Sequence, residues 1–162
     1  MPLPEAIAGD EIALALEQHM PEAIAGAKPA ADGPVLEIAA ASLAPVSRYL
    51  KDTAGFQQFG AISAVDWWPR SPRFEVVYFV RSIRRNKRFR FAVRIGENED
   101  LDSVTSVWRG ANWYEREVFD LFGIRFRDHP YLERIMMPAD WEGHPLRKDY
   151  PTHGHKYSYS NE

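Results

Sequence analysis

The sequence predicts an α+β fold: a small, mostly antiparallel sheet with helices on one face, followed by a long extended C-terminal tail. Three observations predict it: a hairpin pattern in the middle of the chain, capped helical patterns on both sides of it, and prolines at 130, 138, 145 and 151 that preclude a long helix near the end. We therefore expect residues 1–123 to form the α+β domain and residues 124–162 to form an extended, partner-binding tail.

The hairpin is the clearest predicted element. Residues 74–83 are almost all β-branched or aromatic, and a second strand follows the turn at 84–87. This second strand alternates with a period of two, which is typical of an antiparallel sheet with one covered face. The apolar face carries Phe89, Phe91, Val93 and Ile95, and the other face carries Arg88, Arg90 and Arg94.

Three helices are expected around this hairpin. Asp10 is a good N-cap for a first helix that ends at Pro21. A second spans 42–53, with Ser42 as its cap. The third begins near Asn112, where Glu115 completes a capping box, and ends at Gly123.

The remaining segments of the domain are predicted to be strands and connections. Residues 35–40 and 56–68 have strand patterns, and residues 69–72 form a proline-rich turn. We expect a loop at 27–34, and an acidic linker at 97–102 that ends the sheet.

The composition excludes several classes of site. The chain has 162 residues, 45% of them hydrophobic, a net charge of −3 and no cysteine. A chain without cysteine forms no disulfide and no cysteine-ligated metal or iron–sulfur site. The first basic residue is Lys28, so we expect neither a signal nor a transit peptide, and no apolar stretch approaches the roughly 20 residues of a membrane span. Nucleotide-binding glycine loops and a nucleophile elbow are absent from the sequence.

Two clusters of polar residues are candidates for catalytic or metal sites. Glu115, Glu117 and Asp120 suggest acid–base chemistry, but residues two apart on a helix do not converge, and Arg116 can pair with Asp120 four residues on. A structural role is therefore favoured. The histidines also lack a metal-binding pattern, and those followed by proline are expected to donate to backbone carbonyls; they are His129, His144, His153 and His155.

The basic hairpin at 81–94 is the strongest indication of nucleic-acid binding. However, its alternation sends Phe89 and Phe91 to the face opposite the arginines, whereas a stacking platform needs both on one face. A docking face for an acidic partner, or a solvated face, is favoured over nucleic acid.

The last third of the sequence has a distinctive motif. Residues 113–124 read WYEREVFDLFGI, residues 129–138 read HPYLERIMMP, and residues 140–151 read DWEGHPLRKDYP. This resembles closely the signature of the C subunit of proton-pumping NADH:quinone oxidoreductase (NDH-1, respiratory complex I). The resemblance is specific over residues 108–151, while the sequence of residues 35–95 is generic.

The resemblance implies a cofactor-free, structural subunit of the peripheral arm, on the cytoplasmic side of a bacterial inner membrane. Its partners would be the quinone-site large subunit and neighbouring iron–sulfur subunits, and FMN and the iron–sulfur clusters would lie in those partner subunits. The complex would pass electrons from NADH to quinone and translocate protons. A proline-rich tail that cannot make its own core is what a segment ordered by a partner looks like.

No catalytic, cofactor-binding or metal-binding residue is predicted, and the matched motif supplies a structural and interface set. Its members are Glu115, Arg116, Glu117, Asp120, Gly123, His129, Pro130, Arg134, Gly143, Pro145, Leu146, Arg147, Lys148, Asp149, Tyr150 and Pro151. Three alternatives stay open: the equivalent subunit of a membrane-bound hydrogenase or a photosynthetic NDH complex, a nucleic-acid-binding module, and a small hydrolase that uses Glu115.

Overall fold

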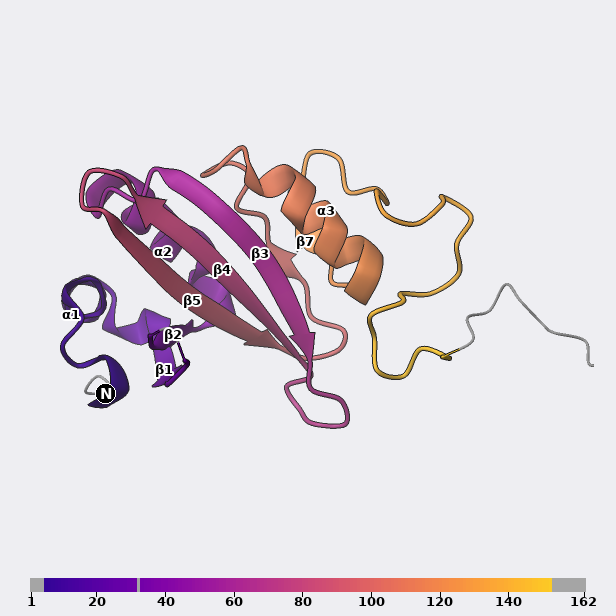
Figure 1. Ribbon diagram of the computed structural model, residues 1–162, viewed down its shortest axis with the longest axis horizontal. Helices are drawn as coiled ribbons and strands as arrows, with labels where there is room; N and C mark the ends of the chain where they lie inside the picture. The colour runs from indigo at the N-terminus through magenta and orange to yellow at the C-terminus, as the bar shows by residue number, and fades with distance from the viewer. Residues whose placement is uncertain (1–4, 32, 153–162) are drawn as a thin grey trace, which may run out of the picture.

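A five-stranded mixed sheet forms the centre of the protein (Figure 1). The computed structural model describes residues 5–31 and 33–152. The strand order is β1-β2-β5-β4-β3, and all pairs are antiparallel except β2 with β5. The strands are β1 (Ile24–Lys28), β2 (Val35–Ile38), β3 (Gln58–Asp66), β4 (Phe74–Ser82) and β5 (Lys87–Ile95).

The hairpin β4–β5 is the middle of the sheet, as the sequence predicted. Its register pairs Tyr78 with Phe91, and the two rings stack with centroids 5.0 Å apart. The apolar residues of β5 are buried, whereas Arg88 and Arg94 are exposed on the other face. The alternation therefore assigned the two faces correctly, and the aromatic residues belong to the core.

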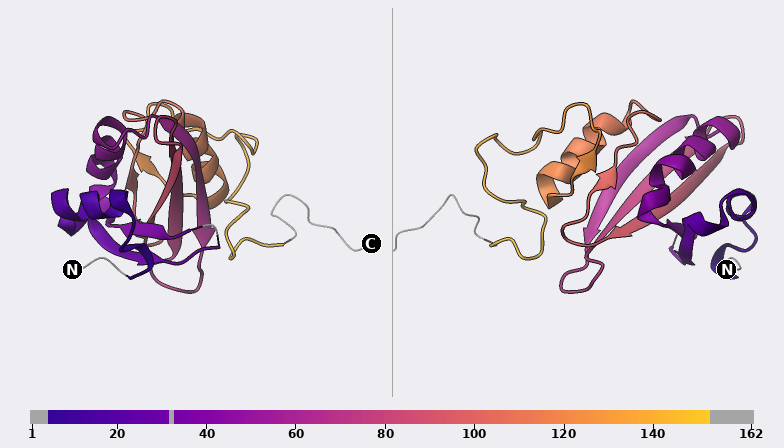
Figure 2. Two further views of the ribbon diagram at one scale, coloured as in Figure 1. Left: turned by 60° about the vertical axis from the view of Figure 1, so that its left-hand side comes forward. Right: turned by 180° about the vertical axis from the view of Figure 1, so that it is seen from behind.

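Helices α2 (Leu43–Arg48) and α3 (Ala111–Phe122) cover the apolar face of the sheet. In the view from behind in Figure 2, α2 lies in front of the strands and α3 lies beside them. Helix α1 (Glu11–His19) lies beside them, and Asp10 caps it by accepting hydrogen bonds from the N–H groups of Ile12 and Ala13. The α+β architecture with helices on one face is confirmed.

Several details differ from the sequence predictions. Strand β1 was not foreseen, because its sequence Ile-Ala-Gly-Ala-Lys has no alternation. The second helix is a composite: a 3-10 turn at Ala40–Ser42, then α2, then a π-helical turn at Tyr49–Thr53, and Ser42 makes no side-chain cap. The acidic linker contains β6 (Leu101–Asp102), which pairs in parallel with β7 (Phe126–Arg127) in a second, two-stranded sheet.

Helix α3 ends as predicted but begins differently. Gly123 has φ +80° and forms the left-handed C-cap. At the other end Gly110 precedes the helix without a side-chain cap. The predicted capping box of Asn112 and Glu115 is wrong, because Asn112 lies inside the helix and the Glu115 carboxylate accepts from Ser103 and Val104.

After β7 the described residues form no further helix or strand up to residue 152. This C-terminal segment, residues 128–152, runs as an irregular path beside α3 (Figure 1). Among the described residues no helix is both long and apolar enough to cross a membrane.

Candidate subunit interface

Three groups of buried charge fix the C-terminal segment and the start of α3 to the domain. We call them the Asp120 cluster, the Arg73 cluster and the Glu115 cluster. Each has a carboxylate or guanidinium that is almost or fully shielded from solvent, and each is satisfied by backbone groups or opposite charges from distant parts of the chain.

In the Asp120 cluster, one carboxylate organises a turn of the segment. Its Oδ2 accepts hydrogen bonds from the backbone N–H groups of Ile135, Met136 and Met137 at 3.0, 2.7 and 2.9 Å. Its Oδ1 accepts from Arg134 at 2.6 Å. Burial alone raises the pKa of Asp120, but the hydrogen bonds from Met137 and Arg134 outweigh it and lower the pKa. The carboxylate is therefore charged at neutral pH.

The same cluster fixes the next loop through backbone atoms. His144 donates from Nδ1 to the carbonyl oxygen of Asp120 at 2.8 Å, and Arg134 donates to the carbonyl of Gly143 at 2.8 Å. The Leu146 N–H donates to the carbonyl of Leu121. A Cβ at Gly123 would lie 2.7 Å from the His144 ring, so this position needs glycine for space as well as for its positive φ.

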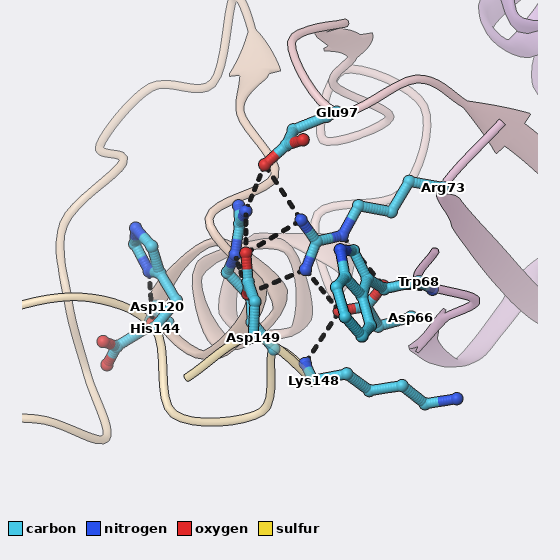
Figure 3. A network of polar contacts seen from close by, with 9 residues as sticks. Asp66, Trp68, Arg73, Glu97, Asp120, His144, Lys148 and Asp149 are labelled. Atoms are coloured by element: carbon cyan, nitrogen blue, oxygen red, sulfur yellow. Dashed lines mark hydrogen bonds and ion pairs between the residues drawn. The ribbon is translucent and has the colours of Figure 1, made fainter. Parts of the chain in front are cut away.

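In the Arg73 cluster, one guanidinium joins three separate parts of the chain (Figure 3). Arg73, just before β4, is 4% exposed and binds Asp66 at the end of β3, at 2.8 and 2.9 Å. It also binds Glu97 after β5, at 2.9 Å, and Asp149 in the segment, at 2.8 and 3.0 Å. Arg147 reaches the same Glu97 and Asp149.

The opposite charges of this cluster favour one another's ionised forms. Hydrogen bonds from Arg73 and then Arg147 hold the pKa of Asp149 well below its ordinary value. Asp66 raises the pKa of Arg73, and Asp149 raises it further. Asp66 also accepts the backbone N–H of Lys148 at 2.8 Å, so the backbone of the segment itself is attached to the end of β3.

The Glu115 cluster lies on the core side of α3. The Glu115 carboxylate accepts from the N–H of Val104 and from the hydroxyl of Ser103, both at 2.7 Å. Burial raises its pKa to about 7, although these two hydrogen bonds lower it. His129 Nε2 lies 3.8 Å from the carboxylate and donates to the carbonyl of Asn112 at 3.2 Å, while Nδ1 accepts from Tyr131 N–H.

Arg116 does not pair with Asp120, and that prediction is wrong. It donates to the carbonyls of Glu133 and Arg134, at 3.0 and 3.5 Å. Its guanidinium carbon lies 5.0 Å from the ring centroids of both Trp113 and Tyr131. Asp120 takes Arg134 instead, because the segment folds back along α3 and brings a second arginine to the carboxylate.

The rest of the predicted set lies around these clusters. Glu117 is half-exposed on α3, and the Lys148 side chain is exposed. Tyr150 donates from its backbone to the carbonyl of Arg147 and from its hydroxyl to that of Glu142, at 3.1 and 3.4 Å. Pro130 and Pro151 are exposed and Pro145 is half-buried.

Four residues of these clusters were missed by sequence reasoning: Asp66, Arg73, Glu97 and Ser103. Asp66 and Arg73 flank the proline-rich turn between two strands. Their charges stand next to apolar runs, and this position could have indicated that they form an ion pair. Glu97 stands in the sequence only as part of an acidic linker. Ser103 has no local signal, since its partner is twelve residues away on a helix.

The alternative sites are not assembled by the described structure. Across residues 5–31 and 33–152 there is no group of three metal-ligating side chains; His153 and His155 lie outside this part. The prediction that His129 and His144 donate to backbone carbonyls is confirmed. Phe89 and Phe91 are 5% and 0% exposed, so they offer no stacking surface to a base.

Comparison with known proteins decides the family. The family model described as respiratory-chain NADH dehydrogenase, 30 Kd subunit, matches residues 36–156. The protein belongs to this family.

Individual relatives agree. The C subunit of NADH-quinone oxidoreductase from Paramagnetospirillum magneticum is 43% identical over 143 residues, which cover 86% of this chain and 72% of that protein. The C subunit from Roseiflexus sp. (strain RS-1) is 40% identical over 148 residues, with 90% and 85% covered. A solved trypsin-resistant fragment of Nqo5 has a TM-score of 0.65 and 30% identity, covering 75% of this chain and 98% of the fragment.

The members of this complex I family are subunits of a multisubunit NADH–quinone oxidoreductase. The matched range contains the hairpin, α3 and all three clusters. The resemblance of the motif to the C subunit is therefore confirmed, and it extends over the strands whose sequence is generic.

Proposed function

We propose that the protein is a cofactor-free structural subunit of the peripheral arm of NADH:quinone oxidoreductase. In this proposal it docks onto the quinone-site large subunit and neighbouring iron–sulfur subunits, on the cytoplasmic side of the bacterial inner membrane. Those subunits hold FMN and the iron–sulfur clusters that carry electrons from NADH to quinone, coupled to proton translocation. Two facts support this: the family, and a sequence with no cysteine to hold a cluster.

The observation that carries the docking role is the stack around Arg116. Trp113 is 64% exposed and Tyr131 55% exposed, and both rings contact a guanidinium that two backbone carbonyls hold in place. Trp, Tyr and Arg are the residues that dominate binding energy at protein interfaces. Met136 and Leu146, 57% and 52% exposed, add apolar surface on the same segment.

The clusters give this surface its shape before any partner binds. An irregular segment ordered only on association would lose conformational entropy at that moment, which weakens binding. Here the Asp120 and Arg73 clusters hold residues 134–149 against the domain. From the sequence alone we expect a partner to order the C-terminal segment. In the structure, contacts within the protein already hold much of this segment.

The test is assembly of the complex with single surface variants. Trp113→Ala and Tyr131→Ala should each lower the amount of assembled oxidoreductase on native gels, because each removes an exposed ring from the Arg116 stack. Leu14→Ala, on α1 and 40% exposed, is the control for loss of an exposed apolar side chain elsewhere. Normal assembly with both aromatic variants would contradict the docking role of the Arg116 stack. A wild-type protein that copurifies with no other subunit would contradict the proposed function.

The other functions have less support. A hydrolase built on Glu115 would need substrate access, but the Glu115 carboxylate is fully enclosed between α3 and Val104. The relatives are named as NADH–quinone or NADH–ubiquinone oxidoreductase subunits, which favours NADH as electron donor over the donors of related hydrogenases or photosynthetic complexes.

A further inference from the structure

A hollow of about 590 Å³ lies on the exposed face of the sheet, away from the C-terminal segment. It opens over the turn end of the hairpin β4–β5 and is bounded on one side by the loop before β2. Its lining includes Pro34, Phe79, Arg81, Arg88 and Arg90, and also Asp10, whose carboxylate pairs with Lys87. The hollow thus combines an apolar floor with three guanidinium groups.

Two of these arginines oppose each other directly. Arg81 on β4 and Arg88 on β5 are register partners across the hairpin, and both are exposed. Like charges in directly opposed positions of an antiparallel pair destabilise the sheet. Within residues 5–31 and 33–152, no carboxylate lies within ion-pair distance of either guanidinium.

Four neighbouring basic residues of the hairpin have partners. Arg85 and Lys87 pair with Glu11 and Asp10 at 3.2 and 3.0 Å, and Arg94 lies 3.5 Å from Glu37. Arg90 donates to the carbonyl of Gly33. The hairpin is therefore not a uniformly solvated basic surface: its unbalanced charge lies on the opposed pair at the hollow and on Arg84 in the turn.

We propose that this hollow receives an acidic segment of another subunit of the same complex, with its carboxylates bound by Arg81 and Arg88. The inference rests on the proposed function, and it adds a second contact on the opposite face of the sheet from α3. Charge complementarity carries it, because a carboxylate between the two guanidiniums replaces their mutual repulsion with charge-assisted, bidentate hydrogen bonds.

The floor of the hollow favours a polypeptide over a nucleic acid. Phe79 is half-buried between the arginines, and the aromatic residues of β5 point into the core. Single strands are bound by several exposed aromatic rings along a continuous basic groove. An acidic peptide needs only what is present: a short apolar floor and two neighbouring cations.

Charge reversal tests the role of the opposed pair in the intact complex. Arg81→Glu and Arg88→Glu should each lower the yield of assembled complex about tenfold at physiological salt, because an anionic partner is then repelled. Arg84→Glu is the matched control: Arg84 is exposed in the turn of the same hairpin but does not line the hollow, so it should assemble normally. Equal yields for all three variants would overturn the proposal.

A photo-crosslink identifies the occupant directly. Gln58 is exposed and lines the hollow, so a benzoyl-phenylalanine placed there should crosslink to an acidic stretch of another subunit in the purified complex. Exchanging the acidic residues of that stretch for lysine should then restore assembly of the Arg81→Glu variant. A complex that copurifies intact but gives no crosslink, a crosslink to a non-acidic stretch, or a nuclease-sensitive crosslink overturns this inference and leaves the proposed function standing. A protein that purifies alone overturns both.

Discussion

Glu115 and Asp120 are fully buried carboxylates on one helix, and the protein treats them in opposite ways. Asp120 faces the C-terminal segment and has three backbone N–H donors and an arginine, so its pKa is lowered. Glu115 faces the core and has one backbone N–H and one hydroxyl; burial dominates, and its pKa rises to about 7.

The difference shows what fixes a buried charge. Burial acts on both groups in the same direction, so the number and charge of the donors decide the outcome. Asp120 is a charged anchor whose removal leaves an arginine and three amides without a partner. Glu115 is a buried polar group of the core, and the folded protein is more stable when the Glu115 carboxyl is protonated. Replacing each carboxylate by its amide should therefore change stability with opposite signs.

The largest effect is expected for Asp120→Asn. The amide keeps the shape but loses the charge that binds Arg134, and its NH2 group meets N–H donors, so we expect a loss of roughly 2–4 kcal/mol. The pKa of Asp120 is lowered in the fold, so its contribution is present above its unfolded pKa and is lost as the pH falls through its folded pKa. The measurement is chemical denaturation of the pure protein at pH 7 and at low pH. An equal loss of stability at pH 3 and pH 7 would contradict the assignment.

Glu115→Gln should stabilise the protein, by about 1–3 kcal/mol at pH 8. The folded pKa is raised, so wild-type stability is complete below the unfolded pKa near 4.5 and declines as the pH rises to about 7. The amide can still accept from Val104 and donate to Ser103. Thermal unfolding from pH 4.5 to 8 measures this: the two proteins should agree at the acidic end and diverge above it. Destabilisation at pH 8 would show that Glu115 is a charged anchor like Asp120.

Arg147→Ala and Lys148→Ala distinguish the contribution of a side chain from that of a backbone N–H at the Arg73 cluster. Arg147 binds Asp149 and Glu97 with its guanidinium, so its loss should weaken the segment by about 1 kcal/mol. Lys148 contributes its backbone N–H to Asp66, and Lys148→Ala should leave the segment unchanged. Hydrogen exchange of the amides at 147–150 distinguishes the two. A larger effect from Lys148 would refute this view of the cluster.

The smallest effect is expected for Tyr78→Phe. The Tyr78 hydroxyl is buried near Glu115 and has no hydrogen-bond partner in the described structure, and burial and the charge of Glu115 raise its pKa. Removing an unsatisfied hydroxyl should stabilise the fold by about 1 kcal/mol or leave it unchanged. Calorimetry of the variant provides the test, and a clear loss of stability would mean that Glu115 depends on this hydroxyl.

The sequence predicted the sheet and failed on the clusters for one reason. Alternation along β5 and the positive-φ end of α3 at Gly123 are local properties, so periodicity and glycine placement reveal them. The partners of Glu115, Asp120 and Arg73 are 7 to 76 residues away, and no spacing rule encodes such contacts. The i, i+4 rule paired Arg116 with Asp120 because it considers only one helix.

The motif resemblance named several residues that the structure brings into contact, but it gave no geometry for them. It named Asp120, Arg134 and Asp149 within one set, and the structure shows that each holds the C-terminal segment. That this segment binds a partner stays a proposal, as does the division into two parts at residue 123.

The central claim is that the C-terminal segment has its conformation before any partner binds. Hydrogen exchange of the isolated protein, compared with the assembled complex, tests this claim. The account predicts that the amides of Ile135, Met136 and Met137 are already protected in the isolated protein, because Asp120 accepts all three, and that Asp120→Asn removes this protection. Exchange at the rate of an unfolded peptide in the isolated protein, with protection only in the complex, would contradict it.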